Sequence, residues 1–163
     1  MELYLTVSKE PAATAGHWLR LPLTEAVPLE GRLTAWLFTD CRDYFSGMAE
    51  QVERSRLPAL NRLALLLQTL SEEEQDKLDA MLECEYSKSI GAVERLIAQL
   101  PCAELLFGIE TDEDLGRYHM EQTLHILLPQ PLAQHFDYAG YGQTVRKMNI
   151  GTFTSSGFLM PKF

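Results

Sequence analysis

The stretch that decides the fold runs Leu57-Pro-Ala-Leu-Asn-Arg-Leu-Ala-Leu-Leu-Leu-Gln-Thr-Leu-Ser-Glu-Glu-Glu74. Its apolar residues recur every three or four positions, at Leu60, Leu63, Ala64, Leu67 and Leu70. This spacing places them on one stripe of a helix, whereas the residues before the stretch alternate as in strands. The stretch therefore predicts a helix from Leu57 and a boundary between an N-terminal sheet and a helical part.

Two more helices are predicted directly after it. Ser71 and Glu74 form a capping box, in which each side chain can bond to the backbone N–H of the other residue. The predicted buried face of this second helix comprises Leu78, Met81 and Leu82. A third helix is predicted over Ile90–Leu100, because Pro101 follows it and ends it.

Three segments before the deciding stretch alternate in the manner of strands. They are Glu2–Val7, His17–Leu21 and Leu33–Phe38, of which the first two are expected to pair. Residues 40–56 are polar and irregular, and we expect at most a short helix there. Trp18 and Trp36 fall in two of the strands, and we expect both in the core.

The C-terminal part predicts a mixture of helices and strands. Acids crowd the first turn of a helix that opens at Thr111 and is expected to reach Pro129. The other predicted elements are a strand at Ala103–Ile109, short helices at Pro131–Phe136 and Tyr138–Val145, and a hairpin over Gly151–Met160 that turns at 155–157.

These elements predict an α+β fold with a small N-terminal antiparallel sheet, a central helical lobe and a C-terminal mixed α/β lobe. The predicted divisions are 1–56, 57–102 and 103–163. A chain of 163 residues has room for such small packed lobes.

The three cysteines, Cys41, Cys84 and Cys102, form no CxxC pair and predict neither a disulfide framework nor a zinc site. We expect buried thiols in a reducing compartment, hence the cytoplasm, with Cys84 as a small core residue. The first nine residues show no signal peptide, and the longest apolar run, Leu63–Leu67, is too short to span a bilayer. We therefore expect a soluble protein.

The net charge of −9 is concentrated in the middle of the chain. Residues 71–121 hold fourteen acids against four bases, whereas residues 1–70 hold eight against seven. Such a field repels nucleic acid and membrane surfaces and attracts basic partners. We therefore expect no direct binding to nucleic acid or to a membrane.

No catalytic constellation is evident in the sequence. The four histidines lack metal-ligand spacing, since His119 and His125 are six residues apart and fall on different faces of a helix. The carboxylates beside Cys84 should raise the pKa of its thiol and weaken it as a nucleophile. We expect no enzyme and no cofactor; an enzyme would need a pocket that gathers groups such as Cys84, His119 and Glu121.

The acidic helices permit two interpretations. A row of carboxylates is most simply a solvated helix face. Carboxylates at spacings of three and four residues, however, lie about 5–6 Å apart, which is of the same order as the spacing of phosphates along a nucleic-acid strand. Rows of Glu and Asp could therefore imitate a DNA backbone for a protein that grips DNA with Lys and Arg.

The order of the segments resembles the ArdA antirestriction proteins of mobile genetic elements, conjugative transposons among them. The resemblance covers residues 57–163 well and the N-terminal strands in outline. It rests on Leu60-Asn61-Arg62-Leu63, the acidic helix Ser71–Glu85, the passage Thr111-Asp112-Glu113-Asp114-Leu115-Gly116-Arg117-Tyr118, the passage Phe136-Asp137-Tyr138-Ala139-Gly140-Tyr141-Gly142, and the closing segment from Gly151 to Leu159.

The resemblance implies a three-domain α+β inhibitor, commonly dimeric, without catalysis or cofactor. It implies that the protein mimics B-form DNA in the groove of a Type I restriction–modification enzyme. The implied phosphate surrogates are Glu72, Glu73, Asp76, Asp79, Glu83, Glu85, Glu110, Asp112, Glu113, Asp114 and Glu121. The alternative is a protein-interaction module of a mobile element, with the same fold but no mimicry, that binds through an apolar patch such as the Tyr138/Tyr141 region.

Overall fold

The computed structural model describes residues 2–8, 17–24, 30–38, 48–86 and 89–162. It has six α-helices and two antiparallel sheets within these residues, which confirms the predicted α+β class. The chain divides into two compact units, one made of residues 1–75 and 85–97 and the other of residues 76–84 and 98–163. The division into three lobes stays a prediction. No helix in the described ranges combines the length and the apolar character needed to cross a membrane.

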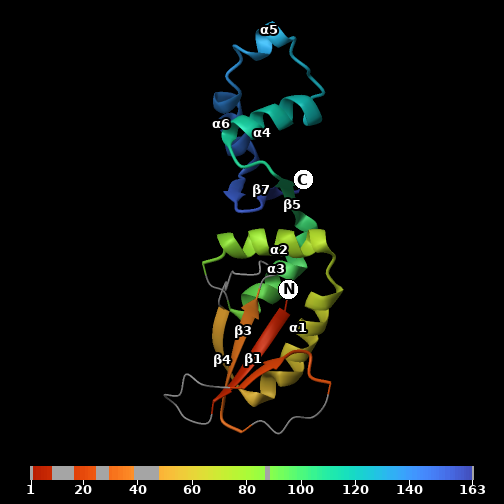
Figure 1. Ribbon diagram of the computed structural model, residues 1–163, viewed down its shortest axis with the longest axis vertical. Helices are drawn as coiled ribbons and strands as arrows, with labels where there is room; N and C mark the ends of the chain where they lie inside the picture. Colours follow the sequence, from red (N-terminus) through yellow and green to blue (C-terminus); the bar gives the residue numbers. More distant parts are fainter. Residues whose placement is uncertain (1, 9–16, 25–29, 39–47, 87–88, 163) are drawn as a thin grey trace. The chain divides into compact units, whose positions relative to one another are not determined.

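The first unit contains a four-stranded antiparallel sheet (Figure 1). Its strands are β1 (Glu2–Ser8), β2 (His17–Arg20), β3 (Arg32–Phe38) and β4 (Met48–Val52), in the order β2-β1-β3-β4. The first three confirm the predicted strands. The fourth corrects the expectation of an irregular segment, and residues 39–47 lie outside the described ranges. Because β4 is a short edge strand with the polar pair Glu50-Gln51, it shows little alternation by itself.

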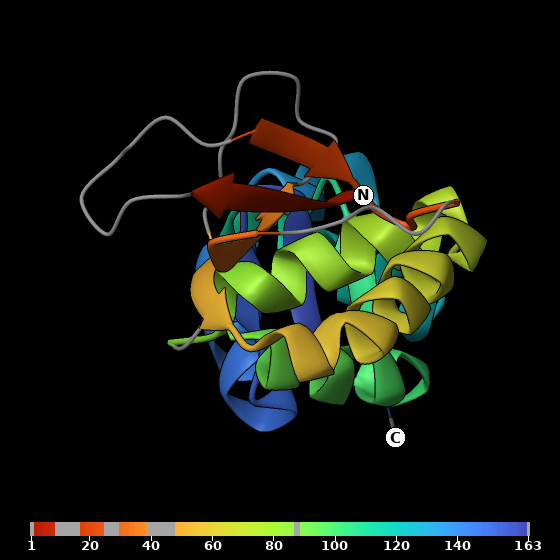
Figure 2. The same cartoon turned by 90° about the horizontal axis from the view of Figure 1, so that it is seen from below.

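One face of this sheet forms a core with the helices. Leu3 lies opposite Leu37 and Leu5 opposite Ala35, and these side chains are fully or almost fully buried. Helix α1 (Leu57–Thr69) lies against β1 on that side of the sheet (Figure 2). The apolar stripe predicted for this helix is confirmed at Leu60, Leu63, Ala64 and Leu67, which are all buried, whereas Leu70 lies just after the helix and is half-buried.

Helix α2 (Glu72–Cys84) begins where predicted, because both bonds of the capping box are present: the Ser71 N–H donates to Glu74 Oε2 at 2.9 Å, and the Glu74 N–H to Ser71 Oγ at 3.3 Å. Helix α3 (Ile90–Gln99) follows. The carboxylate of Glu50 accepts the Ile90 N–H at 2.9 Å and so ties β4 to the start of α3. Two short 3-10 turns, η1 (Arg54–Arg56) and η2 (Leu100–Cys102), flank the helical part.

The second unit joins part of α2 to a three-stranded sheet and a pair of crossing helices. The strands β5 (Ala103–Phe107), β6 (Thr152–Thr154) and β7 (Gly157–Pro161) lie in the order β5-β7-β6 and confirm the predicted hairpin. The helices are α4 (Asp112–Tyr118), the π-helix η3 (His119–Thr123), α5 (Gln130–Ala133) and α6 (Tyr138–Asn149). Their core is formed by Leu106, Leu115, Val145 and Phe158.

The helix that opens at Thr111 ends at Thr123, so its predicted extension to Pro129 is wrong. The end has a physical cause in the backbone. His125 takes a left-handed conformation (φ 56°), the Leu124 N–H bonds to the His119 carbonyl, and the Ile126 N–H bonds back to the Met120 carbonyl at 2.8 Å. A helix that ends in a left-handed residue usually has glycine at that position. Because the residue here is a histidine, the end of the helix could not be predicted from the sequence.

Two glycines allow α4 and α6 to cross closely. A Cβ added to Gly116 would lie 2.1 Å from the Tyr138 carbonyl oxygen, and one added to Gly142 would lie 1.7 Å from the Asp112 carbonyl oxygen. Any side chain at either position would therefore push the helix backbones apart. This contact explains why a glycine follows Tyr141 in the passage that resembles the ArdA family.

Three expected core residues are exposed instead. Trp18 is 51% exposed on β2, and both Cys84 and Cys102 are exposed, so the expectations of a core tryptophan and of buried thiols are wrong at these positions. Trp18 lies on an edge strand, where its ring can pack against neighbours without being covered. Cys41 lies outside the described ranges, so the expectation for it stays untested.

The thiol of Cys84 should be a slow nucleophile. Its partial burial and, secondly, the negative charge of Glu83 both raise the pKa of this thiol above its ordinary value. Near pH 8 the fraction of Cys84 present as thiolate should thus be lower than that of an unfolded cysteine. The rate of alkylation of Cys84 should keep rising at a pH where the rate for an ordinary thiol no longer changes. The measurement is the pH profile of iodoacetamide alkylation in a variant with Cys41 and Cys102 changed to serine. Identical pH profiles of alkylation for the folded protein and for its denatured control would contradict this expectation.

Candidate partner-binding surface

The first turn of α2 presents open carboxylates. Glu72 and Glu73 occupy this turn, where their charge suits the positive end of the helix dipole, and Asp76 follows one turn later. All three are exposed, whereas the neighbouring Glu74 is used in the capping box. The beginning of α2 therefore presents negative charge to the solvent.

The later acids of α2 and its end contact the chain itself. The Glu83 carboxylate accepts the Ser155 N–H at 2.9 Å and also bonds to the Ser155 hydroxyl, which ties α2 to the hairpin turn. Glu85 forms an ion pair with Arg95 at 2.7 Å. Asp79 is half-buried. Their carboxylates are thus partly occupied by internal contacts.

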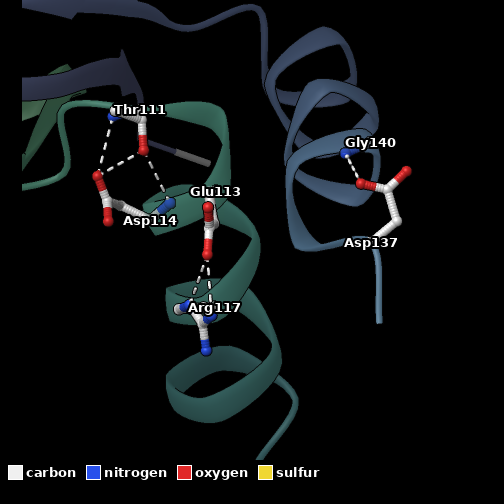
Figure 3. A network of polar contacts seen from close by, with 6 residues as sticks. All are labelled: Thr111, Glu113, Asp114, Arg117, Asp137 and Gly140. Carbon is white, nitrogen blue, oxygen red and sulfur yellow. Dashed lines mark hydrogen bonds and ion pairs between the residues drawn. The ribbon is translucent and has the colours of Figure 1, made fainter. Parts of the chain in front are cut away.

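The acids of α4 have internal partners as well (Figure 3). Asp114 accepts the Thr111 N–H and hydroxyl, and the Asp114 N–H donates to Thr111 Oγ1 at 3.1 Å, which completes a capping box. Glu113 pairs with Arg117 at 2.8 Å, one turn along the same helix. These contacts stabilise the beginning of α4.

A further ion pair joins α4 to α6. Arg146 lies 3.1 Å from Asp112 and 5.4 Å from the centre of the Phe153 ring. The side chain of Asp137 caps α6 by accepting the Gly140 N–H at 2.8 Å (Figure 3). Asp112 therefore helps to fix the crossing of the two helices.

Five predicted surrogates remain free for a partner, and we call them the open acids. They are Glu72, Glu73, Asp76, Glu110 and Glu121. All five are exposed, and within the described part of the chain none has a hydrogen bond or an ion pair from its side chain. The structure thus separates acids that contact other residues of the described chain from acids that do not, a distinction that the sequence did not make.

The residues suggested for an enzyme do not form a common site. Cys84 lines a mostly apolar cavity of about 500 Å³ with residues such as Met81, Cys102 and Leu159, and neither His119 nor Glu121 lines it. His119 Nδ1 instead lies 2.8 Å from the hydroxyl of Tyr141. Within the described ranges, no group of three His, Cys, Asp or Glu side chains is placed to hold a metal ion.

The exposed apolar surface lies elsewhere than expected. Tyr138 is buried and Tyr141 half-buried, so the patch suggested at these tyrosines is wrong. Large apolar side chains are exposed instead between η3 and α6, at Leu124, Ile126, Leu127 and Leu132. Leu127 is 78% exposed. The exposure of these side chains was not predicted, because a helix that continued to Pro129 would have buried one side of this segment.

The fold is that of an acidic α+β protein, and most of the acids of residues 71–121 lie on its helices. Comparison with known proteins gives the family. The family model described as "Antirestriction protein (ArdA)" matches residues 12–160. The chain therefore belongs to the ArdA antirestriction family, which is a family of inhibitor proteins rather than enzymes. A search of curated proteins found no match.

Proposed function

We propose that this protein inhibits a Type I restriction–modification enzyme by occupying its DNA-binding groove as a mimic of DNA. The observation that supports this best is the set of open acids, which are exposed and whose side chains form no hydrogen bond or ion pair within the described ranges. Basic side chains that grip phosphates would bind these carboxylates in the same way. The acids that maintain the fold would add to the field around them.

The amount of charge favours action as a dimer. Duplex DNA carries one charge per about 1.7 Å, so the net charge of −9 matches about 15 Å of duplex. Two copies related by symmetry would match roughly 30 Å, close to one helical turn of about 34 Å. We propose that the exposed apolar segment from Leu124 to Leu132 forms part of the contact between the copies.

In this proposal the protein is encoded by a mobile element and acts in the cytoplasm, where restriction enzymes meet incoming DNA. The exposed apolar segment also favours the second candidate, a protein-interaction module without mimicry. The two candidates differ in what carries the binding energy. Binding by DNA mimicry depends on charge, so its affinity falls as salt rises, whereas the affinity of binding through apolar side chains does not.

A restriction-protection assay tests the proposed function. Purified protein is added to a Type I restriction enzyme and unmodified DNA at low and at high salt. We expect protection at near-stoichiometric protein and its loss as salt rises. Cleavage that continues in the presence of folded protein would contradict the proposal, and protection that is indifferent to salt would favour the interaction module.

A further inference from the structure

We propose that the second unit binds a small, neutral aromatic molecule in the cavity beside α2. The cavity has a volume of about 500 Å³, and its walls come from α2, from the strands β5, β6 and β7, and from the segments that lead into these strands. All the residues that line it belong to 76–84 and 98–163, so the site lies within one compact unit. Binding at this site goes beyond the proposed inhibition and does not depend on it.

The strand register and two short side chains produce this cavity. Ala103 on β5 lies opposite Pro161 on β7. Thr152 on β6 lies opposite Leu159, two positions before Pro161, so these residues share one face of the sheet. Cys84 lines the cavity from the side of α2. Because Ala103 and Cys84 have short side chains, a space stays between the helix and the sheet that protein interiors normally fill.

The chemistry of the walls favours an aromatic molecule without charge. The residues that line the cavity include no Asp, Glu, Lys, Arg or His. Partial burial and the negative charge of Glu83 raise the pKa of the Cys84 thiol, which keeps this wall neutral as well. Met81, Cys84 and Cys102 contribute sulfur atoms, which make favourable contacts with aromatic rings. A cavity of about 150 Å³ holds a benzene ring, so this cavity has room for about three rings.

Two polar side chains are placed to orient such a molecule. The amide of Gln99 and the hydroxyl of Thr152 line the cavity, and both residues are exposed. Neither side chain has a hydrogen-bond partner among the residues that the structure describes. Small-molecule sites typically combine apolar walls with a few polar groups of this kind. We therefore expect a ligand with a hydrogen-bonding group, such as a hydroxyl or an amine, on its rings.

Ile150 is the observation that most favours an occupied cavity. It follows α6 in a left-handed conformation (φ 51°, ψ 39°), which a β-branched residue rarely adopts and in which glycine is usual. Its side chain lines the cavity and is 79% exposed, so packing within the chain does not favour isoleucine either. A molecule in the cavity would cover this side chain, which gives a reason for an apolar residue here.

The test uses the whole protein and N-phenylnaphthylamine, a neutral aromatic probe whose fluorescence rises in apolar surroundings. We expect saturable binding of about one probe per chain, since the cavity has room for about three rings. The matched control is anilinonaphthalene sulfonate, which has the same rings and an added negative charge. It should bind at least about tenfold more weakly, because the walls offer no cation to the sulfonate and the net charge of −9 repels it.

Three variants separate binding from stability. Ile150→Gly should weaken binding of the probe about tenfold, while its Tm should equal or exceed that of the wild type because glycine suits this conformation. Gln99→Ala should weaken binding about fivefold without a change in Tm, because one hydrogen bond is lost from an exposed residue. Leu127→Ser changes the exposed apolar segment outside the cavity and should bind the probe like the wild type.

Two further measurements locate the probe and define the ligand class. In a Cys41→Ser variant, saturating probe should slow the alkylation of Cys84 and Cys102 by iodoacetamide, because both thiols line the cavity. Naphthol should displace the probe at a lower concentration than decanol, which has the same numbers of carbon and oxygen atoms. The rings of naphthol contact the sulfur atoms and lose less conformational freedom than a flexible chain.

Several outcomes would each overturn the proposal. They are no binding by the wild type, wild-type affinity in both Ile150→Gly and Gln99→Ala, equal binding of the two probes, alkylation unaffected by the probe, and displacement by decanol at a lower concentration than by naphthol. Loss of binding in Leu127→Ser would also overturn it and would assign the probe to the exposed apolar segment. Because none of these measurements uses a restriction enzyme, their failure is distinct from a failure of the proposed inhibition.

Discussion

Changing Glu72, Glu73 and Asp76 to Gln, Gln and Asn should weaken inhibition of a Type I restriction enzyme between about 10- and 100-fold. Each exposed ion pair contributes up to about 1 kcal/mol, and tenfold in affinity corresponds to about 1.4 kcal/mol. The three side chains keep their size and lose only their charge. The measurement is the protein concentration that halves cleavage of unmodified DNA.

The matched control neutralises three other exposed acids. Glu30→Gln, Glu53→Gln and Glu94→Gln change the net charge by the same amount, and all three side chains are exposed. We expect this control to inhibit within about threefold of the wild type, because a change in the overall field alone acts weakly at physiological salt. Equal losses in both triple variants would show that only net charge matters and would contradict a defined contact at the start of α2.

Replacing Gly142 by alanine should destabilise the second unit by about 3 kcal/mol or more. The added Cβ would lie 1.7 Å from the Asp112 carbonyl oxygen and 3.0 Å from the Gly116 backbone nitrogen. Both neighbours are backbone atoms, so no side chain can turn away to make room. Helix α4 must move away from α6, and the Asp112–Arg146 ion pair must change with it.

Thermal unfolding checks this expectation, with Gly91→Ala as the control. No atom lies within 4 Å of a Cβ placed at Gly91 in α3, so this alanine should leave stability unchanged or raise it by up to about 1 kcal/mol. For Gly142→Ala we expect a fall in Tm on the order of 10 °C. A Tm equal to that of the wild type would contradict the close crossing of α4 and α6.

The sequence predicted those elements whose signals are local. The capping box at Ser71 was visible because its two residues are three positions apart. The start of the helix at Thr111 was visible from the acids of its first turn, although its capping box was not predicted. The stripe of α1 and the closing hairpin were visible because their patterns are local as well. The end of η3 was not, because the chain turns there with His125 rather than glycine in a left-handed conformation.

The sequence predicted which segment of the chain carries the candidate site, but not which of its acids are occupied by contacts with other parts of the chain. The sequence grouped eleven acids together, but it could not show that Glu83 bonds to Ser155, 72 residues away, or that Asp112 pairs with Arg146. Contacts of this kind depend on how distant elements pack, and no local pattern encodes them. The exposure of Trp18 could not be predicted either, since alternation does not tell which face of a sheet packs against the helices.

DNA mimicry is tested most directly by displacement of DNA from the target enzyme. A fluorescent, unmodified duplex is bound to a purified Type I restriction enzyme, and the wild-type protein is titrated in at two DNA concentrations and two salt concentrations. We expect that the protein releases the DNA, that the midpoint of release rises in proportion to the DNA concentration, and that the affinity of the protein for the enzyme falls steeply with salt. DNA that stays bound beside saturating protein would contradict DNA mimicry.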